Sequence, residues 1–522
     1  MRKAFTTLLA IILACTCAQA QLRINTSSPL SKLNMAVMAI KNLYVEEVDQ
    51  EKLTEDAIKG MLEKLDPHST YSNAKEVKQM NESLEGSFEG IGVQFNIMED
   101  TLVVLQTISN GPSEKVGIIP GDRIVLVNDT AIAGVNMSRE DIMHRLRGPK
   151  GTKVELKIVR QGIKGLLPFT VIRDKIPVYS IDASYMIRPG IGYIRIGNFG
   201  ATTYEEFMKA MAKLSGEGMK DLIIDLQDNG GGYLQASVML INEFLDKGDM
   251  IVYTEGRSTP RRDYVADGSK TFDGRVVVLV NEYSASASEI TAGAFQDQDR
   301  GLIVGRRTFG KGLVQRPIDF EDGSMIRLTI AHYYTPSGRC IQKPYTKGDK
   351  KDYVSDIDKR FRNGEMTNAD SIHFADSLKY HTLRKNRVVY GGGGIMPDYF
   401  VPLDTVKYTK FHRQLSAKSH IINANLRYID EHRKELQKKY KTFEEFNAQF
   451  EVPQSMVDGI IEKAAADNIK PKDDEELALT LPYLKTQLKA LIARDLWDMN
   501  EYYHVFNETN DIVKKGIELL QQ

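Results

Sequence analysis

This chain has few cysteines, and its histidines are not clustered. Two of its three cysteines lie within the first 20 residues, so Cys340 alone remains if those residues are removed, and one thiol cannot form an internal disulfide. The nine histidines form no HExxH or similar pair, and no cysteines have metal-ligand spacing. We therefore expect no metal and no cofactor.

A strong charge imbalance and long apolar runs are also missing. The formal net charge is -1 and no basic block occurs, which argues against nucleic acid as a partner. Beyond the N-terminus no stretch reaches the ~20 apolar residues that a membrane-spanning helix needs. About 500 residues exceed what one hydrophobic core supports, so we expect three or four domains.

The N-terminus has the pattern of a removable export signal over residues 1–20. Positive charge at residues 1–3 precedes an apolar run at 4–14, and Ala18-Gln19-Ala20 gives the small-x-small pattern that a signal peptidase cuts after. Ile12-Leu13-Ala14-Cys15 also resembles a lipoprotein signal, in which Cys15 would carry the lipid. Both alternatives stay open, and both predict export to the periplasm or cell envelope, with a membrane link only through such a lipid.

The spacing of apolar residues predicts three kinds of segment. Residues 31–64 have helical spacing and indicate two helices that stop at Asp66-Pro67. Residues 85–173 indicate short strands with Gly and Pro turns and one helix at 138–146. The strands are expected at 101–106, 123–127 and 153–159.

Further along, apolar strands alternate with helices, which is typical of an α/β layered domain. The strands are expected at 192–196, 221–226, 275–280 and 302–304, and the helices at 203–214, 233–245 and 287–295. Residues 346–390 are polar and predict a flexible insertion. Residues 404–522 are helical and highly charged, which favours a solvated helical appendage.

Ser286 lies where one of these strands turns into a helix, within a segment of small residues at 281–289. At a helix N-terminus, free backbone N–H groups and the helix dipole can stabilise an oxyanion beside a projecting hydroxyl. A serine at this position can equally be a plain N-cap. By residue type alone, Ser284 and Ser288 compete with it as nucleophile.

Lys311 follows the next strand, between two glycines and among Phe309, Leu313 and Val314. An apolar loop can desolvate a lysine and lower its pKa, so that the neutral amine accepts a proton from serine. Most lysines in glycine turns are surface residues, but Ser286 and Lys311 together are a more specific signal than either alone.

A triple glycine at 230–232 follows the strand at 222–226. Glycines there permit close backbone approach to a ligand, and the following helix directs N–H groups toward it. Alone, the motif fits a phosphate loop or a tight turn equally well, and it has no Walker lysine.

Five stretches resemble the carboxyl-terminal processing peptidases, or tail-specific proteases, a serine peptidase family with a Ser-Lys dyad. They are SASASEITAGAFQDQDRGLIVGRRTFGKGLVQ (284–315), LIIDLQDNGGG (222–232), LDPHSTY (65–71), GIGVQF (90–95) and GIMPDYFVP (394–402). The resemblance covers roughly residues 30–402. It implies Ser286 as nucleophile, Lys311 as general base and Gln315 as the residue that orients the lysine amine. It also implies an oxyanion hole from the backbone N–H groups of Ala287 and of Gly230 or Gly231.

One position departs from the family. Gln227 stands where the family commonly has arginine, which puts a charge-based role there in doubt but not the backbone role.

Residues 85–173 resemble a PDZ domain, with Gly90, Ile91, Gly92 and Val93 in the position of the carboxylate-binding loop. Such a loop holds a terminal carboxylate by backbone N–H groups while the peptide adds a strand to a sheet edge. The alternative is a structural β-domain without a ligand. Whether the module blocks the enzyme or delivers substrate is not decided by the sequence.

The expected fold is multidomain α+β. Its parts are a signal (1–20), a helical region (21–84), a PDZ domain (85–173), an α/β layered crotonase/Clp-like Ser-Lys peptidase domain (174–403) and a helical region (404–522).

The expected function is a serine endopeptidase that cleaves exported or cell-envelope proteins, recognising their free C-terminal tails. A noncatalytic PDZ scaffold or chaperone on a peptidase-like fold is the main alternative. An acyl-CoA enzyme of related layout would have no need of the serine-lysine pair.

Overall fold

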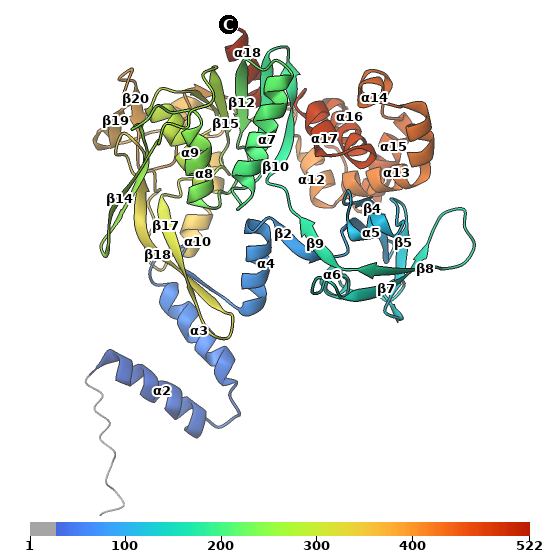
Figure 1. Ribbon diagram of the computed structural model, residues 1–522, viewed down its shortest axis with the longest axis horizontal. Coiled ribbons are helices and arrows are strands. Elements are labelled where there is room, and N and C mark those ends of the chain that lie inside the picture. The colour runs from blue at the N-terminus through green and yellow to red at the C-terminus, as the bar shows by residue number, and fades with distance from the viewer. Residues whose placement is uncertain (1–27) are drawn as a thin grey trace, which may run out of the picture. The chain divides into compact units, whose positions relative to one another are not determined.

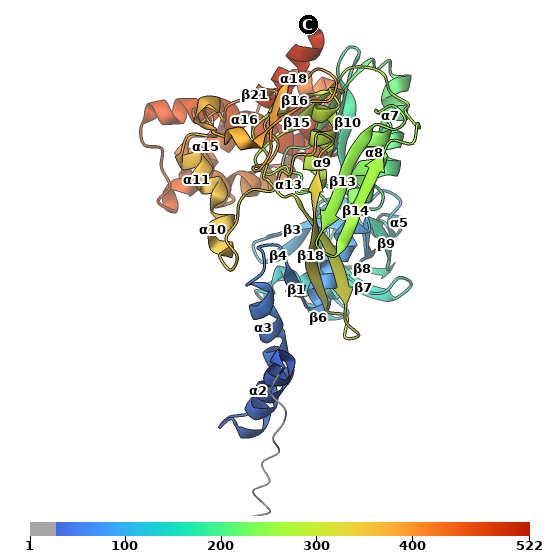
Figure 2. The same cartoon turned by 90° about the vertical axis from the view of Figure 1, so that its left-hand side faces the viewer.

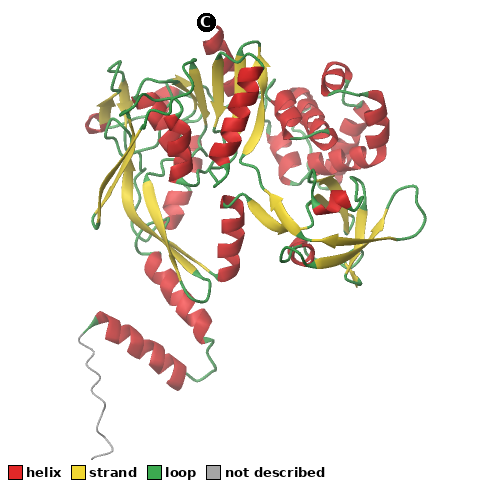
Figure 3. Ribbon diagram, in the orientation of Figure 1, coloured by secondary structure: helices red, strands yellow, loops and turns green. Residues whose placement is uncertain are grey.

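The computed structural model describes residues 28–522, and the chain divides after Leu65 into two compact units. The expected export signal and Cys15 lie outside the described residues. Helices and strands are mixed along the chain (Figure 3). No helix within residues 28–522 is long and apolar enough to cross a bilayer.

The first unit contains the two expected helices, α2 (Pro29–Leu43) and α3 (Gln50–Leu62). Each begins at a side-chain cap: Ser28 Oγ accepts from the Ser31 N–H and Asp49 Oδ1 accepts from the Lys52 N–H, both at 3.1 Å.

The β-rich segment forms a sheet with its own hydrophobic core. Its strands, in spatial order, are β3 (Val93–Met98), β4 (Thr101–Thr107), β5 (Arg123–Val127), β7 (Lys153–Val159) and β8 (Leu167–Ile172), and β6 (Thr130–Ala131) pairs with β5. The helices are α5 (Pro112–Lys115) and α6 (Arg139–Leu146), and β2 (Ser87–Gly90) pairs with β9 (Asp174–Pro177). The expected strands and helix of this segment are confirmed, and β3 is an edge strand.

A second sheet of six strands forms the α/β layer. Its order is β10 (Ile181–Arg188), β11 (Ile191–Ile196), β12 (Asp221–Asp225), β15 (Val276–Val280), β16 (Leu302–Gly305) and β21 (Tyr399–Phe400). Only β10 runs antiparallel to its neighbour. The central strands β12 and β15 are buried throughout apart from a half-buried first residue in β12, because side chains cover both faces of a parallel sheet.

Three helices pack on one face of this sheet, and their side chains share its core. They are α7 (Thr203–Gly216), α8 (Leu234–Asn242) and α9 (Ala287–Asp297), shown in Figure 1. The strand and helix alternation expected from the sequence is confirmed here.

A third sheet joins segments far apart in the sequence. It contains β1 (Thr70–Ser72), β18 (Met325–Tyr334), β13 (Met250–Gly256) and β14 (Thr259–Val265) in that order, with β17 (Leu313–Asp319) also paired to β18. Figure 2 shows β13, β14 and β18 side by side. The helix α4 (Ala74–Leu84) follows β1 directly.

The segment 346–390 is packed, and the expectation of a flexible insertion is wrong. It contains α10 (Lys350–Val354), α11 (Asp356–Arg362), two 3₁₀ turns and a hairpin of β19 (Lys379–His381) with β20 (Val388–Tyr390). Tyr353 and Arg360 are only 4% and 3% exposed, and Arg360 donates to the Thr308 and Arg307 carbonyls. Polar composition was misleading because the polar side chains bind backbone groups of the neighbouring loop.

The C-terminal region is helical, as expected, but its helices bury a core, so the expectation that it is merely solvated is wrong. They are α12 (Lys410–Ala417), α13 (His420–Lys439), α14 (Phe443–Gln449), α15 (Gln454–Ala466), α16 (Asp474–Leu496), α17 (Met499–Phe506) and α18 (Asp511–Gln521). Residues from α12 to α17 form a core of their own. Helix α18 instead places Ile512, Val513 and Ile517 against Ile223 and Val277 of the six-stranded sheet, on the face opposite α7 to α9.

Candidate active site

Ser286 occupies a strained turn between β15 and α9. Its φ of 56° and ψ of -115° lie outside the regions that a non-glycine residue normally adopts, a strain of about 1–3 kcal/mol. The turn leaves Ser286 half-buried as the N-cap residue of α9, at the positive end of the helix dipole.

The two competing serines are committed to structural hydrogen bonds. Ser284 Oγ donates to the Leu226 carbonyl at 2.7 Å and Ser288 Oγ donates to the Asn229 carbonyl at 2.9 Å. Both residues are 0% exposed. Of the three hydroxyls, that of Ser286 is therefore the one that a substrate can approach.

Lys311 lies in the loop between β16 and β17. Its Nζ donates to Gln315 Oε1 at 3.1 Å, and Gln315 Nε2 donates to the His68 carbonyl. Burial, with a smaller contribution from the Arg327 guanidinium, lowers the pKa of Lys311 to about 8, although Glu289 and Asp66 act in the opposite direction.

A buried carboxylate ties the serine turn to the lysine loop. Glu289 Oε2 accepts from the backbone N–H of Ser286 at 2.9 Å and of Lys311 at 2.8 Å. Its Oε1 accepts from Thr308 Oγ1 at 2.6 Å and from the Gly310 N–H at 2.7 Å. Burial raises the pKa of the Glu289 carboxyl, while these four donors favour its ionised form.

Tyr333 makes a second bridge between the same two residues. Its hydroxyl contacts the Ser286 carbonyl at 3.2 Å and the Lys311 carbonyl. The backbones of Ser286 and Lys311 thus share one partner for their N–H groups and one for their carbonyls. Sequence reasoning missed Glu289 and Tyr333, although Glu289 was detectable as a carboxylate three residues after an N-cap serine.

The side chains of Ser286 and Lys311 are not hydrogen-bonded to each other. Among the described residues, no hydrogen bond links Ser286 Oγ to Lys311 Nζ, and the amine is bonded to Gln315 instead. Catalytic hydrogen bonds commonly tighten only when substrate is bound, so this geometry is compatible with proton transfer between the two.

The glycine run lies directly against the serine. A Cβ on Gly231 would come within 2.7 Å of Ser286 Cβ and 2.9 Å of the Ala287 nitrogen, so only glycine fits there. The Gly231 N–H donates to Asn229 Oδ1 at 2.8 Å. In the part of the chain that the structure describes, the N–H groups of Gly230 and Ala287 donate to no protein acceptor, so both can hold an oxyanion.

Arg195 binds the turn that contains Gln227. Its guanidinium donates to Asp225 Oδ2 at 2.9 Å and to the Gln227 carbonyl at 2.8 Å. The Gln227 N–H in turn donates to Asp225 Oδ1 at 2.9 Å. Arg195, a single cation in the otherwise apolar strand β11, therefore stabilises the turn that leads into the glycine run.

The residues Gly90 to Val93 lie apart from this site, where β2 ends at Gly90 and the edge strand β3 begins at Val93. The carbonyls of Ile91 and Gly92 accept from Ser113 and Ile108. The N–H groups of Ile91 and Gly92 donate to no acceptor within residues 28–522, and Gly92 has a φ of 73°. Two successive free N–H groups around a left-handed residue are the arrangement that binds a carboxylate.

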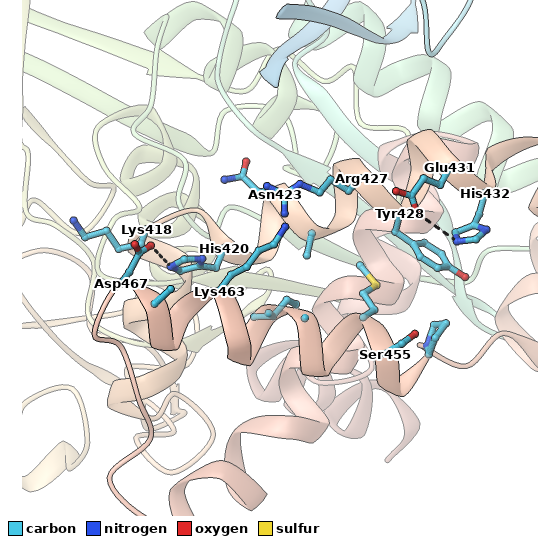
Figure 4. A pocket seen from close by; sticks show the side chains of 16 residues that line it. Lys418, His420, Asn423, Arg427, Tyr428, Glu431, His432, Ser455, Lys463 and Asp467 are labelled. Atoms are coloured by element: carbon cyan, nitrogen blue, oxygen red, sulfur yellow. Dashed lines mark ion pairs between the residues drawn. The ribbon is translucent and has the colours of Figure 1, made fainter. Parts of the chain in front are cut away.

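A groove of about 790 Å³ lies between α13 and α15, away from Ser286 and Lys311 (Figure 4). Its lining is mixed in charge, with Arg427 and Lys463 beside an ion pair of His420 Nε2 and Asp467 Oδ2 at 3.1 Å. None of the residues singled out by the sequence lines it. In the described residues, no group of three or more His, Cys, Asp or Glu side chains is placed to hold a metal ion.

Comparison with known families assigns four segments. Residues 190–353 match peptidase family S41, and residues 90–167 match the PDZ domain. Residues 14–76 match the N-terminal domain of the activating protease CtpB, and residues 411–498 match a family of unknown function.

Individual relatives are about a third identical to this chain over the aligned residues. The carboxy-terminal processing protease CtpA of Bacillus subtilis is 36% identical over 347 residues, which is 65% of this chain and 74% of that protein. CtpB of the same organism is 36% identical over 62% of this chain and 68% of its own length. A solved photosystem II D1 C-terminal processing protease is 32% identical, with a TM-score of 0.35, over 60% of this chain and 84% of that one.

Proposed function

Because this chain belongs to the carboxy-terminal processing proteases of peptidase family S41, it is a serine-type peptidase, and we propose that Ser286 is its nucleophile and Lys311 its general base. The observation that carries this assignment is the double bridge through Glu289 and Tyr333, which fixes the serine turn beside the lysine loop.

The proposed reaction is acyl transfer. Ser286 Oγ attacks the scissile carbonyl carbon while its proton passes to the neutral Lys311 amine. The C–N bond then breaks, the departing amine takes that proton from Lys311, and an acyl-serine ester remains. Water attacks the ester with Lys311 again as base, and Lys311 returns the proton to Ser286 Oγ as the carboxylic acid product is released.

The remaining residues position these groups. Gln315 accepts one N–H of the Lys311 amine and so orients it, and its own amide is held by the His68 carbonyl. The N–H groups of Gly230 and Ala287 hold the tetrahedral oxyanion. Gly231 does not donate to the oxyanion, because its N–H already binds Asn229. Its role is to leave space for Ser286, which a side chain at this position would fill.

The proposed substrates are exported or cell-envelope proteins with free C-terminal tails. Gly90 to Val93 hold the terminal carboxylate, and the tail adds a strand to the open edge of β3. Charge-assisted hydrogen bonds favour a carboxylate over an amide at such a loop. The N-terminal sequence pattern supports export.

Digestion of casein, an unstructured protein, tests the catalytic assignment. Ser286→Ala is expected to abolish cleavage, and Ser288→Ala, the matched control, is expected to retain it. A folded Ser286→Ala variant that cleaves at the rate of the unmodified enzyme would contradict the proposal. An unmodified enzyme that binds tails but cleaves nothing would favour a scaffold.

Peptides that differ only in a free or amidated C-terminus test the tail preference. The free acid is expected to bind more tightly and to be cleaved faster. Mass spectrometry of cell-envelope extracts, treated with the unmodified enzyme or Ser286→Ala, identifies the natural substrates.

A further inference from the structure

The hydroxyl of Tyr353, a buried residue of helix α10, lies between two side chains that both lead back to Lys311. It is 2.8 Å from His68 Nε2 and 3.3 Å from Gln342 Nε2. Tyr353 belongs to the polar segment 346–390, which the reaction proposed above does not use. Its position in this network gives that segment a connection to the active site.

The direction of each hydrogen bond at this hydroxyl can be assigned. Gly312 presents an N–H at 2.9 Å, so Oε1 of Gln342 must face it, and Nε2 faces Tyr353 as a donor. The hydroxyl therefore accepts from Gln342 and has its own proton left for His68 Nε2. Burial raises the pKa of Tyr353, which retains that proton. Burial, with the charge of Lys311, lowers the pKa of His68 to about 4, so its Nε2 is an acceptor.

One arm of the network leads through His68 to the lysine amine. The His68 N–H donates to Asp66 Oδ1 at 2.9 Å, and Tyr353 holds the imidazole, so the residue is fixed on both sides. The His68 carbonyl accepts from Gln315 Nε2, and Gln315 Oε1 accepts from the Lys311 amine at 3.1 Å. The direction of the amine therefore depends on the orientation of His68.

The other arm leads through Gln342 to the backbone beside the lysine. Gln342 Oε1 accepts from the N–H of Gly312, the residue that follows Lys311. A glycine has more backbone freedom than other residues, and this hydrogen bond restrains it. The two arms form a closed path from the Lys311 backbone to the Lys311 amine, and the Tyr353 hydroxyl joins its halves.

We propose that Tyr353 is a positioning residue for the general base: its hydroxyl fixes His68 and Gln342, and through them the direction of the Lys311 amine. The inference rests on the proposed role of Lys311 as base. Proton transfer requires the amine lone pair within reach of Ser286 Oγ, and a restrained amine samples fewer unproductive directions than a free one.

The Tyr353 ring is held independently of its hydroxyl. It meets the rings of His68 and Phe309 edge to face, with centroids 5.1 and 5.9 Å away. Lys343 Nζ lies 4.2 Å from the centroid of the Tyr353 ring and donates to the Tyr353 carbonyl at 3.2 Å. Tyr353→Phe therefore removes the two hydrogen bonds of the hydroxyl and retains the packing of the ring.

The kcat and KM of Tyr353→Phe for a fluorogenic peptide, measured between pH 5.5 and 10, test the proposal. The plateau of kcat is expected to fall about tenfold and KM to change by less than about twofold, because the base is misdirected while substrate binding is intact. The half-maximum is expected to stay near the Lys311 pKa of about 8, because the burial and charges that set this pKa are retained. Tyr345→Phe is the matched control. It removes a hydroxyl from the neighbouring ring that makes no hydrogen bond within the described residues.

Two results would overturn the positioning role. One is an unchanged plateau of kcat in Tyr353→Phe. The other is a half-maximum that rises toward 10.5, the ordinary pKa of lysine, because it would mean that the site has loosened and admitted water.

A double-variant cycle tests the route through Gln315. In Gln315→Ala the amine has lost its acceptor, so adding Tyr353→Phe is expected to lower kcat by less than about threefold, through the Gln342 arm alone. The same tenfold loss in both backgrounds would show that Tyr353 acts elsewhere and would overturn the proposal. Full cleavage by Ser286→Ala or Lys311→Arg would instead contradict the catalytic assignment itself, whatever the result for Tyr353→Phe.

Discussion

Lys311 is a lysine whose surroundings favour the neutral amine. Since a base must be unprotonated, kcat is expected to rise about tenfold per pH unit below the pKa of about 8 and to level off above it. A kcat profile for a chromogenic or fluorogenic peptide between pH 5.5 and 10 measures this. A half-maximum near pH 6.5 would point to a histidine base instead.

Two variants serve as controls for that profile. Lys311→Arg keeps the charge but cannot lose a proton at these pH values, so it is expected to be inactive throughout. Lys311 affects the imidazole of His68: burial, with the charge of Lys311, lowers the pKa of His68 to about 4. Its Nε2 is bonded to the Tyr353 hydroxyl at 2.8 Å, so modification of histidines is expected to leave the half-maximum unchanged.

Glu289 acts on the same profile through its charge. The carboxylate raises the pKa of Lys311, so Glu289→Gln is expected to move the half-maximum of kcat below that of the unmodified enzyme. It is also expected to lower kcat by about a hundredfold or more. The amide NH₂ of glutamine is a donor, so it cannot accept the hydrogen bonds from the N–H groups that the carboxylate binds. Glu289→Asp retains the charge and is expected to keep the half-maximum near its original pH even where kcat falls. An unshifted profile in Glu289→Gln would leave Glu289 a purely structural role.

What the sequence could predict at this scale depended on local pattern. Ser286, Lys311 and Gln315 stand in short motifs. Tyr333 and the carbonyl of His68 are brought to the site by pairing of β1 and β17 with β18, which no local spacing encodes. The sequence also could not tell whether Gly230 or Gly231 has the free N–H group. That depends on which of the two N–H groups the Asn229 side chain accepts, which only the folded structure shows.

Among the elements, α18 has a role that its composition concealed. It is charged on one side, but Ile512 and Val513 are 3% and 0% exposed against the six-stranded sheet. The elements that periodicity predicted well were those with one clear apolar face, such as α7 and β5. The charged helices were misjudged because a helix can be strongly charged overall and still bury a narrow apolar stripe.

Shortening one of these side chains tests the packing of α18. Ile512→Ala is expected to lower the free energy of unfolding by about 2–4 kcal/mol, since it leaves a cavity against the sheet. Lys514→Ala, on the exposed side of the same helix, is expected to change it by less than about 0.5 kcal/mol. Urea unfolding followed by circular dichroism measures both. Equal effects would mean that α18 does not pack on the sheet in solution.

On the scale of the whole molecule, the PDZ sheet is fastened to the C-terminal helices. Arg123 of β5 pairs with Asp430 of α13 at 2.6 Å. Gln106 Nε2 of β4 donates to the carbonyls of Arg494 and Trp497 at 2.7 and 2.8 Å. These contacts join segments more than three hundred residues apart, which sequence pattern alone could not foresee.

A charge swap tests this connection. Arg123→Asp places two acidic groups together and is expected to increase hydrogen exchange in β5 and α13, while the double variant Arg123→Asp with Asp430→Arg restores the protection. Native-state hydrogen exchange with mass spectrometry reads out both segments. Unchanged exchange in the single variant would show that the two parts move independently in solution.

The placement of α18 also bears on how this chain is made. The strands that it covers are complete by Gly305, yet the helix itself begins at Asp511. At ribosomal speeds of about 5–20 residues per second, the face of these strands that α18 covers stays exposed for on the order of ten seconds or more after β16 is made. A nascent chain therefore contains Ser286 and Lys311 long before α18 covers this face of the sheet. The sheet is therefore expected to reach its final packing only after α18 has been made, whether the chain folds during synthesis or after export.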